Sequence, residues 1–302
     1  MAMNRSLFKK QLQLGLNTVF GMEYNRYPEE WRDIFDINTS VKAYEEDVLM
    51  AGLGTAPVKA EGAGVSFDEG AESYVARYIH NTVALAFAIT QEAEEDGLYG
   101  SIAGKYSKSL ARGLQNTKEV TGANVLNNGF SASYPGGDGV ALFSISHPIW
   151  GGGVQANMFT TQPDLCESAL EAADIAIGLW VDERGIRIAA KPKRLIVPNG
   201  NKYVAQRLLF SDFRPATGDN DINALKSIGT YAGGVSVNHY LTDPIGWYIK
   251  TDVADGLKHF VRKKVERGLE GEFETGNMRY KARERYSFGW SDYRGCWGSA
   301  GT

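Results

Sequence analysis

The fold is decided by residues 91–130, which read Q-E-A-E-E-D-G-L-Y-G-S-I-A-G-K-Y-S-K-S-L-A-R-G-L-Q-N-T-K-E-V-T-G-A-N-V-L-N-N-G-F. The stretch has no proline, and its apolar residues recur at helical spacing: Ile102, Ala103, Tyr106, Leu110, Leu114, Val120 and Val125. Asn128 and Gly129 supply the left-handed stop that ends many helices. The pattern predicts one amphipathic helix over about residues 91–128. A helix of that length needs another long element packed along it.

The front of this predicted helix is acidic, with Glu92, Glu94, Glu95 and Asp96. Negative side chains stabilise the first turn of a helix, where unpaired N–H groups carry partial positive charge. A carboxylate pair of a hydrolase is the competing interpretation of the same residues. The position at the start of the helix favours a solvated first turn.

The composition is that of an ordinary globular protein. The chain has 302 residues, of which 43% are hydrophobic and 23% charged, which is enough for a sizeable core in two or more units. Its formal net charge of −4 gives no basic excess for tight wrapping of nucleic acid. The two cysteines, Cys166 and Cys296, are too few for a disulfide framework or a zinc site.

The N-terminal region predicts two short helices and no targeting segment. Residues 1–25 lack the features of a signal peptide, and no apolar run approaches the roughly 18 residues of a membrane span, so we expect a cytosolic product without a membrane partner. Residues 6–19 predict one helix, and Pro28 suits the first position of a second helix that carries Trp31 and Ile34. Too small to form a core alone, these helices either dock on their own chain or pack on a neighbouring subunit.

Residues 44–70 predict a long hairpin with a mobile end. Six residues punctuate two short strand-like runs: Gly52, Gly54, Pro57, Gly62, Gly64 and Gly70. The hairpin has too few large apolar side chains to bury itself, so it needs a partner surface. Residues 74–90 are rich in β-branched and aromatic residues and predict a strand that leads into the long helix.

Helices and strands alternate beyond the long helix, which indicates the α+β class. The pattern predicts a turn at 134–139, a strand at 140–145, an open loop at 147–153, a helix capped by Asp164, a turn at 182–185, a buried strand at 195–197 and a helix at 203–209. From residue 243 onward strands dominate. In residues 277–290, one face carries Met278, Tyr280, Ala282, Tyr286, Phe288 and Trp290, interrupted by Glu284, and the other carries Arg279, Lys281, Arg283 and Arg285.

No phosphate-binding or calcium-binding motif is complete. Neither glycine-rich run, 136–139 or 151–153, is followed by the lysine of a phosphate loop. Residues 219–223 begin like a calcium loop, but Ala224 and Thr230 stand where its glycine and glutamate belong. Helix capping by Asp221, within this segment, explains the acidic residues better.

The histidines and serines also lack the spacing of a reactive site. The four histidines lie far apart: His80, His147, His239 and His259. Ser291 and Asp292 have no histidine near them in sequence, and no G-x-S-x-G motif is present. We therefore predict no catalytic, cofactor-binding or metal-binding residue and no enzyme activity.

Five segments carry a family resemblance through their order. They are G-L-G-T-A-P-V-K-A-E-G-A-G-V-S-F-D-E-G at 52–70, A-I-T-Q-E-A-E-E-D at 88–96, A-L-F-S-I-S-H-P at 141–148, P-K-R-L-I-V-P at 192–198 and R-E-R-Y-S-F-G-W-S-D-Y-R-G-C-W-G-S at 283–299. Together they resemble the major capsid protein of tailed bacteriophages, with the Hong Kong 97 type of shell fold, over nearly the whole chain. The order is also similar to that in capsid proteins of Mu-like phages.

The resemblance implies a division of the chain. The implied parts are an N-terminal arm at 1–43, an extended loop at 44–72, a peripheral domain with the spine helix at 73–165, an axial domain at 166–249 and return strands of the peripheral domain at 250–302. Such proteins self-assemble into hexamers and pentamers of an icosahedral head around double-stranded DNA. The implied location is the virion capsid, after assembly in the host cytoplasm.

Several partners are implied as well. A separate scaffolding protein is expected, because the arm is too short to contain the scaffolding segment of some relatives, and a portal and a decoration protein are further candidates. Lys59 lies in the loop that some relatives crosslink, but no acceptor or catalytic acid is identified. The basic face of residues 279–285 either pairs with acids of a neighbouring subunit or contacts packaged DNA without reading its sequence.

Two alternatives to a phage shell stay open at this point. Within the same fold, the chain could form a cellular nanocompartment, an encapsulin-like shell that encloses an enzyme. In another class, it could be a soluble α+β hydrolase that uses the carboxylates at 92–96.

Overall fold

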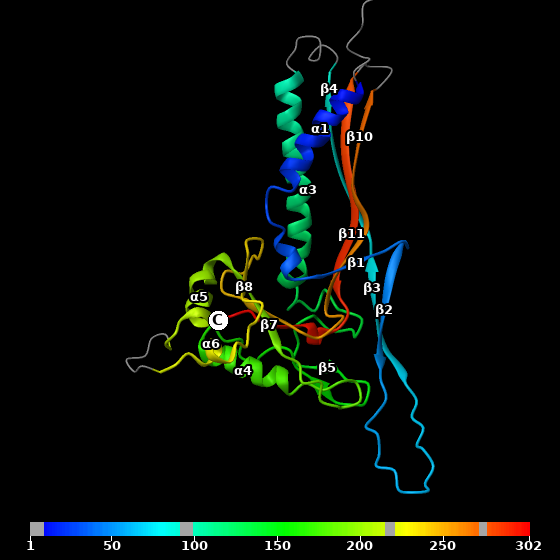
Figure 1. Ribbon diagram of the computed structural model, residues 1–302, viewed down its shortest axis with the longest axis vertical. Coiled ribbons are helices and arrows are strands. Elements are labelled where there is room, and N and C mark those ends of the chain that lie inside the picture. Colours follow the sequence, from blue (N-terminus) through cyan, green and yellow to red (C-terminus); the bar gives the residue numbers. More distant parts are fainter. Residues whose placement is uncertain (1–8, 91–98, 215–220, 272–276) are drawn as a thin grey trace, which may run out of the picture.

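The long helix predicted from the sequence is present as α3, Tyr99–Asn127, in the computed structural model. The structure describes residues 9–90, 99–214, 221–271 and 277–302. The predicted acidic front of this helix, at 91–98, lies outside the described residues. The helix runs beside long strands at one end of an elongated molecule, and smaller helices and strands gather at the other end (Figure 1). The need for a long packing partner is therefore met.

The partner of α3 is a four-stranded sheet in the order β1-β10-β11-β4. Its strands are β1 (Asp36–Thr39), β4 (Asn81–Ile89), β10 (Leu257–Gly271) and β11 (Met278–Trp290). Ala103, Leu110 and Leu114 of α3 are buried, as predicted, whereas Tyr106 is 55% exposed, with its ring centroid 5.7 Å from that of Phe87. Gly122 admits Trp31, whose Cβ would lie 3.2 Å from a Cβ added there, so this helix-weakening glycine permits close packing.

The N-terminal segment crosses α3 and confirms one of the two predicted helices. Helix α1 (Lys9–Tyr24) buries Leu16 and Phe20 against α3 and β11. The second predicted helix is wrong in type and start, because η2 is a single 3-10 turn over Glu30–Asp33. Its first N–H groups are held by the side chain of Glu119 on α3, which ties this short turn to the helix beside it.

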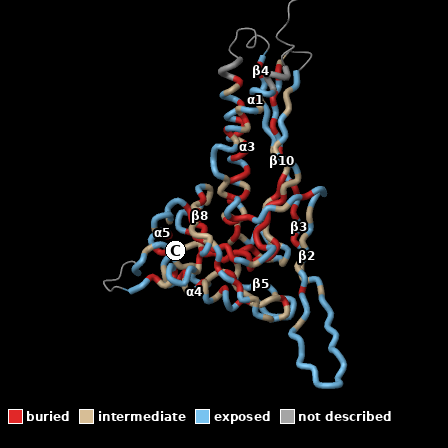
Figure 2. Tube along the Cα trace, in the orientation of Figure 1, coloured by how far each residue is buried: buried red, intermediate tan, exposed pale blue. Residues whose placement is uncertain are grey.

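The predicted hairpin is confirmed. Strands β2 (Tyr44–Ala51) and β3 (Ala71–Ile79) pair antiparallel and end at the pair Ala51 and Ala71, and residues 52–70 project beyond them as exposed chain (Figures 1 and 2). The single strand predicted at 74–90 is instead two strands, β3 and β4, in different sheets. The break is at His80, whose ring nitrogens lie 2.9 Å from the hydroxyl oxygen of Ser40 and 3.0 Å from that of Ser287.

A second four-stranded sheet, in the order β12-β9-β7-β8, organises the other end of the molecule. The elements there are α4 (Glu167–Gly178), β7 (Pro192–Pro198), η3 (Asn199–Asn201), α5 (Lys202–Phe210), α6 (Ala224–Ile228), β8 (Val235–Asn238), β9 (Trp247–Thr251), η4 (Tyr293–Gly295) and β12 (Cys296–Ser299). Leu195 and Ile249 face a core shared with α4 and α5, while Ile196 and Tyr248 face a second core shared with α3. The sheet is thus buried on both sides, as the apolar run at 195–197 predicted.

Four local predictions beyond α3 are wrong. The cap of α4 is Cys166 and not Asp164, whose carboxylate accepts from the N–H of Thr302, and the cap of α6 is Asn223 and not Asp221. Residues 140–145 form no strand. The side chain of Asn157 bonds the carbonyl of Leu142 and the N–H of Ser144, which are backbone groups that a neighbouring strand would otherwise pair. The loop predicted at 147–153 begins with the two-residue strand β5 (His147–Pro148), which pairs with β6 (Val154–Gln155).

Candidate functional site

The structure scatters the residues that sequence reasoning considered for chemistry. The carboxylates at 92–96 and the start of the calcium-like segment, 219–220, lie outside the described residues. The four histidines do not share one site, although two of them contact Ser287: His80 contacts the hydroxyls of Ser40 and Ser287, His147 contacts Asp138 and Asn157, His239 contacts Glu30, and His259 contacts the carbonyl of Ser287. Across the described ranges, no group of three or more His, Cys, Asp or Glu residues could hold a metal ion. Nor does any described helix combine the length and apolarity needed to cross a membrane.

Ser291 and Asp292 take structural partners. The hydroxyl of Ser291 donates to the carboxylate of Asp47 at 2.6 Å and lies 2.6 Å from the hydroxyl of Tyr78. Asp292 accepts from the backbone N–H and the guanidinium of Arg294. The serine therefore joins the hairpin strands to the end of β11 and is not presented to a substrate.

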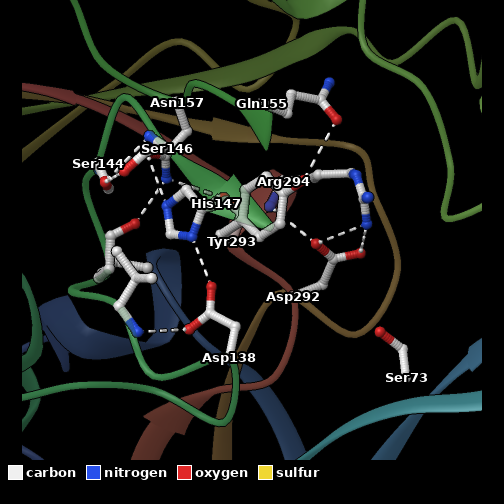
Figure 3. A network of polar contacts seen from close by, with 12 residues as sticks. Ser73, Asp138, Ser144, Ser146, His147, Gln155, Asn157, Asp292, Tyr293 and Arg294 are labelled. Carbon is white, nitrogen blue, oxygen red and sulfur yellow. Dashed lines mark hydrogen bonds and ion pairs between the residues drawn. The ribbon is translucent and has the colours of Figure 1, made fainter. Parts of the chain in front are cut away.

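A cluster of polar side chains forms a buried junction that the sequence did not predict. It consists of Asp138, His147, Asn157, Glu183, Asp292, Tyr293 and Arg294, of which all but Glu183 are labelled in Figure 3. In it, Nδ1 of His147 lies 2.6 Å from Oδ2 of Asp138, and both side chains are fully buried. The imidazole ring stacks on Tyr293 with 3.9 Å between ring centroids. Its Nε2 lies 3.2 Å from Oδ1 of Asn157, so neither ring nitrogen is open to a reacting group.

Asn157 is the centre of this polar junction. Its side-chain nitrogen donates to the carbonyls of Leu142, Tyr293 and Cys296, at 2.6, 3.2 and 3.2 Å. Its side-chain oxygen accepts from the N–H of Ser144 at 2.9 Å. One fully buried amide therefore satisfies four backbone groups from two distant segments, which an apolar side chain could not do.

Arg294 forms the charged half of the polar junction. Its guanidinium bonds Glu183 at 2.7 Å and Asp292 at 3.2 Å, with the side chain only 3% exposed. Burial opposes the charge of Arg294, but the two carboxylates outweigh it and raise its pKa. Burial raises the pKa of Asp292, and Arg294 offsets part of that rise. The three charged side chains hold these segments together, and they also line a cavity of about 460 Å³ beside Gly52 and Asp252.

A buried ion pair lies on the predicted apolar face of β11. Glu284, the one residue that interrupts this face, is 1% exposed and bonds Nζ of Lys118 on α3 at 3.3 Å. The hydroxyl of Tyr24 donates to the same carboxylate at 3.2 Å. Burial raises the pKa of Glu284 while Lys118 lowers it, so the lysine supports the charged form.

A polar cavity of about 830 Å³ lies between α1, α3 and the segment before η2. Its walls include the basic residues Arg26, Lys105, Lys108 and Arg112 together with Glu119. The carboxylate of Glu119 accepts from the N–H groups of Glu30 and Trp31, at 2.9 and 3.1 Å. Burial nevertheless raises the pKa of Glu119 to about 7.

The two most exposed large apolar side chains in the described chain, Val58 at 100% and Phe67 at 97% exposure, lie in the loop at 52–70, which we call the extended loop. The same loop exposes Leu53 at 61% and Val65 at 71%. Single exposed apolar residues are common on protein surfaces, but this loop presents four on one projecting segment. The feature marks an interaction surface rather than a pocket.

The spine helix, the long β10–β11 pair, the projecting loop and the separate mixed sheet together define a Hong Kong 97 type shell fold of the α+β class. Residues 76–298, more than half of the chain, match the model of a family described as Phage capsid protein. The chain therefore belongs to the phage capsid protein family. No curated protein sequence matches it.

Solved structures agree in fold at low sequence identity. The capsid of Cyanophage P-SCSP1u has a TM-score of 0.58 and 10% identity, over 89% of this chain and 86% of that one. The virus-like particle from Pyrococcus furiosus has a TM-score of 0.53 and 12% identity, over 94% and 97%. The procapsid of bacteriophage JBD30 has a TM-score of 0.50 and 14% identity, over 98% and 76%.

These findings confirm the main prediction from the sequence. The protein is a major capsid protein that forms the icosahedral phage head, and its copies associate into capsomers within the virion. Family and fold are those of a structural protein. The matches do not favour the nanocompartment alternative, and the Mu-like subgroup stays a prediction.

Proposed function

We propose that this capsid protein assembles into both hexamers and pentamers, and that each subunit extends its loop across a neighbouring subunit. The observation that carries this proposal is the exposure of Val58 and Phe67 at the end of a hairpin without a covering surface. Burial of apolar area against a second copy would stabilise the contact by about 25 cal/mol per Å² of area removed from water. The function then resides in contacts between subunits, and we infer that the chain has no catalytic activity.

We further propose the domain division that the resemblance implies. The sheet with α3 corresponds to the peripheral domain, at 73–165 and 250–302, and the sheet with α4, α5 and α6 to the axial domain, at 166–249. Residues 1–43 form the arm, and residues 44–72 form the extended-loop region of the family, which includes β2 and the extended loop at 52–70. What supports this division is that each sheet has a core of its own, although a third core with Leu126, Ile196 and Tyr248 lies between them and β12 joins the second sheet through β9.

Membership of the capsid family supports proposed partners as well. We propose a scaffolding protein, a portal and a decoration protein as binding partners, and assembly in the host cytoplasm. A crosslink through Lys59 belongs with these proposals, because the lysine lies in the exposed loop.

Electron microscopy of the purified, expressed protein tests the proposed assembly directly. We expect negatively stained samples to show uniform closed shells or rings of capsomers, because association is the activity of the fold. A protein that remains a small monomer at all concentrations, and loses turnover of a substrate on Glu95→Gln, would favour the hydrolase alternative instead.

The outward face of β11 is the proposed contact with packaged DNA. Arg279, Lys281 and Arg283 are exposed there, and Arg283 pairs with Glu266 of the same chain at 3.3 Å. Phosphate neutralisation releases counterions, so the logarithm of the DNA association constant falls linearly with the logarithm of the salt concentration. Each lost phosphate contact reduces the magnitude of this slope by about 1. We expect the double variant Arg279→Gln, Lys281→Gln to lower that slope by about 2 in anisotropy titrations with duplex DNA, and filled heads to hold less genome.

Two controls separate this proposal from pairing between subunits. Lys202→Gln removes an exposed cation from α5 and should leave the salt slope unchanged. If the double variant instead blocks assembly of empty shells at an unchanged slope, the face pairs with acids of a neighbour.

A further inference from the structure

The extended loop is held at its base by Arg184, which lies in the turn between α4 and β7. The Nε–H of Arg184 donates to the carbonyl of Gly52 at 3.0 Å, and an NH2 group donates to the carbonyl of Glu69. The guanidinium also lies 3.9 Å from the carboxylate of Asp68. One planar side chain thus bonds both legs of the loop, just beyond the last pair of the β2–β3 ladder.

This contact has no substitute in the part of the chain that the structure describes. There, Arg184 is the only residue outside the extended loop with a hydrogen bond to residues 52–70. Within the loop, the carboxylate of Asp68 accepts from the N–H of Gly54, which ties the two legs to each other but not to the body. The direction of the loop relative to the second sheet therefore depends on the ladder and on Arg184.

The turn that carries Arg184 is itself rigid. The carboxylate of Asp182 accepts from the N–H groups of Arg184 and Ile186, both at 2.8 Å. Gly185 adopts a φ of 82°, which favours glycine, and its N–H closes the turn onto the carbonyl of Asp182. The guanidinium of Arg184 lies over the ring of Trp150, 4.4 Å from the centroid, which restricts it further.

The neighbouring residue anchors the turn in the polar junction. Glu183 accepts from the N–H of Trp150 at 2.8 Å and from the hydroxyl of Ser73 on β3 at 3.3 Å. Its other carboxylate oxygen accepts from the guanidinium of Arg294, which also donates to Asp292 (Figure 3). The hairpin and the second sheet are therefore joined at two points by consecutive residues of one turn.

We propose that Arg184 is the positioning residue of the extended loop, which holds the loop in a fixed direction before a neighbouring subunit binds it. The inference rests on the proposed function of the loop as a contact between subunits. A loop that is already oriented loses less conformational freedom when it docks, which strengthens association without a new contact. Replacement of the arginine then leaves the fold intact but makes the loop sample many directions.

A distance measurement on unassembled subunits tests this positioning. Val58 at the loop tip is fully exposed, and the native Cys166 at the start of α4 is exposed while Cys296 is buried. Spin labels on Cys166 and on a Val58→Cys variant report the direction of the loop by double electron–electron resonance. We expect a narrow distance distribution in this parent protein, a broad one with Arg184→Gln, and an intermediate one with Arg184→Lys, which cannot bridge both legs.

Arg187→Gln is the matched control. Arg187 lies in the same turn region but donates to the carbonyl of Leu179 and not to the loop, so its variant should keep the narrow distribution. A distribution that stays narrow with Arg184→Gln overturns the proposal. Should Arg184→Gln fail to fold, the Arg184→Lys variant decides the question by the same comparison.

Shell yield separates this inference from the proposed function of the loop. In label-free protein, we expect Arg184→Gln to reduce closed shells at least tenfold while Arg187→Gln assembles normally. A broad distribution with normal shell yield overturns positioning for assembly. Normal shells after removal of the loop itself would contradict the proposed function of the loop, whatever the distance distribution shows.

Discussion

Deletion of residues 53–67 is expected to abolish closed shells and leave a folded, soluble subunit. The deletion removes Val58 and Phe67, which are 100% and 97% exposed and contribute nothing to the core of the subunit. It keeps Gly52 and residues 68–70 as a four-residue connection between the paired Ala51 and Ala71, a length common in hairpins. A shorter connection costs less closure entropy, by about 1 kcal/mol, so the melting temperature should not fall.

Negative-stain microscopy and sedimentation measure the outcome for assembly, and circular dichroism measures the fold. The double variant Val58→Ser, Phe67→Ser keeps the loop length and should also reduce shell yield at least tenfold, because apolar area is what the contact buries. Glu61→Gln, a polar replacement at an exposed position in the same loop, should assemble as the parent does. Normal shells from the deletion variant would show that the loop is dispensable.

Replacement of Asn157 by leucine should cause the largest loss of stability among single changes in the polar junction, about 3–5 kcal/mol. The leucine is close in size but cannot bond the carbonyls of Leu142, Tyr293 and Cys296 or the N–H of Ser144. Each buried backbone group without a partner costs about 1–3 kcal/mol, and local relaxation or water entry recovers part of the total.

Urea denaturation of unassembled subunits measures this loss as a lower midpoint at an unchanged slope. Asn124→Leu is the matched control, since Asn124 is exposed on α3 and its side chain makes only a weak bond to Asn127. It should change the free energy of unfolding by less than about 0.5 kcal/mol. A loss below about 1 kcal/mol for Asn157→Leu would mean that the amide is not the centre of the junction.

Elements with a strong periodic pattern were predictable in type and place. The strict alternation in residues 277–290 became β11 with Tyr280 and Ala282 buried and Lys281 exposed, and the helical spacing of Leu110 and Leu114 became α3. These patterns report which side of an element faces the core, and that depends on residues close together in sequence.

The residues that cap the helices were predicted less well, because several residues near each helix start could serve as the cap. Asp164 and Asp221 had suitable side chains, yet Cys166 and Asn223 stand at the observed helix starts. The N–H of Thr302 donates to the carboxylate of Asp164, so this carboxylate is engaged away from the start of α4. A short polar side chain near a helix start can thus form several alternative hydrogen bonds. Residues far away in the sequence determine which of these bonds forms.

The order of local patterns along the chain, with a long helix, a glycine-rich hairpin before it and alternating strands near the end, carried the resemblance to the shell fold and so was available from the sequence by itself. Only the tertiary structure brought Lys118 to Glu284, Asn157 to the carbonyls of η4 and β12, and Arg184 to both legs of the extended loop. The physical reason is separation in the chain. Arg184 and Gly52 are 132 residues apart, and no local propensity specifies which buried or projecting groups a distant side chain will meet.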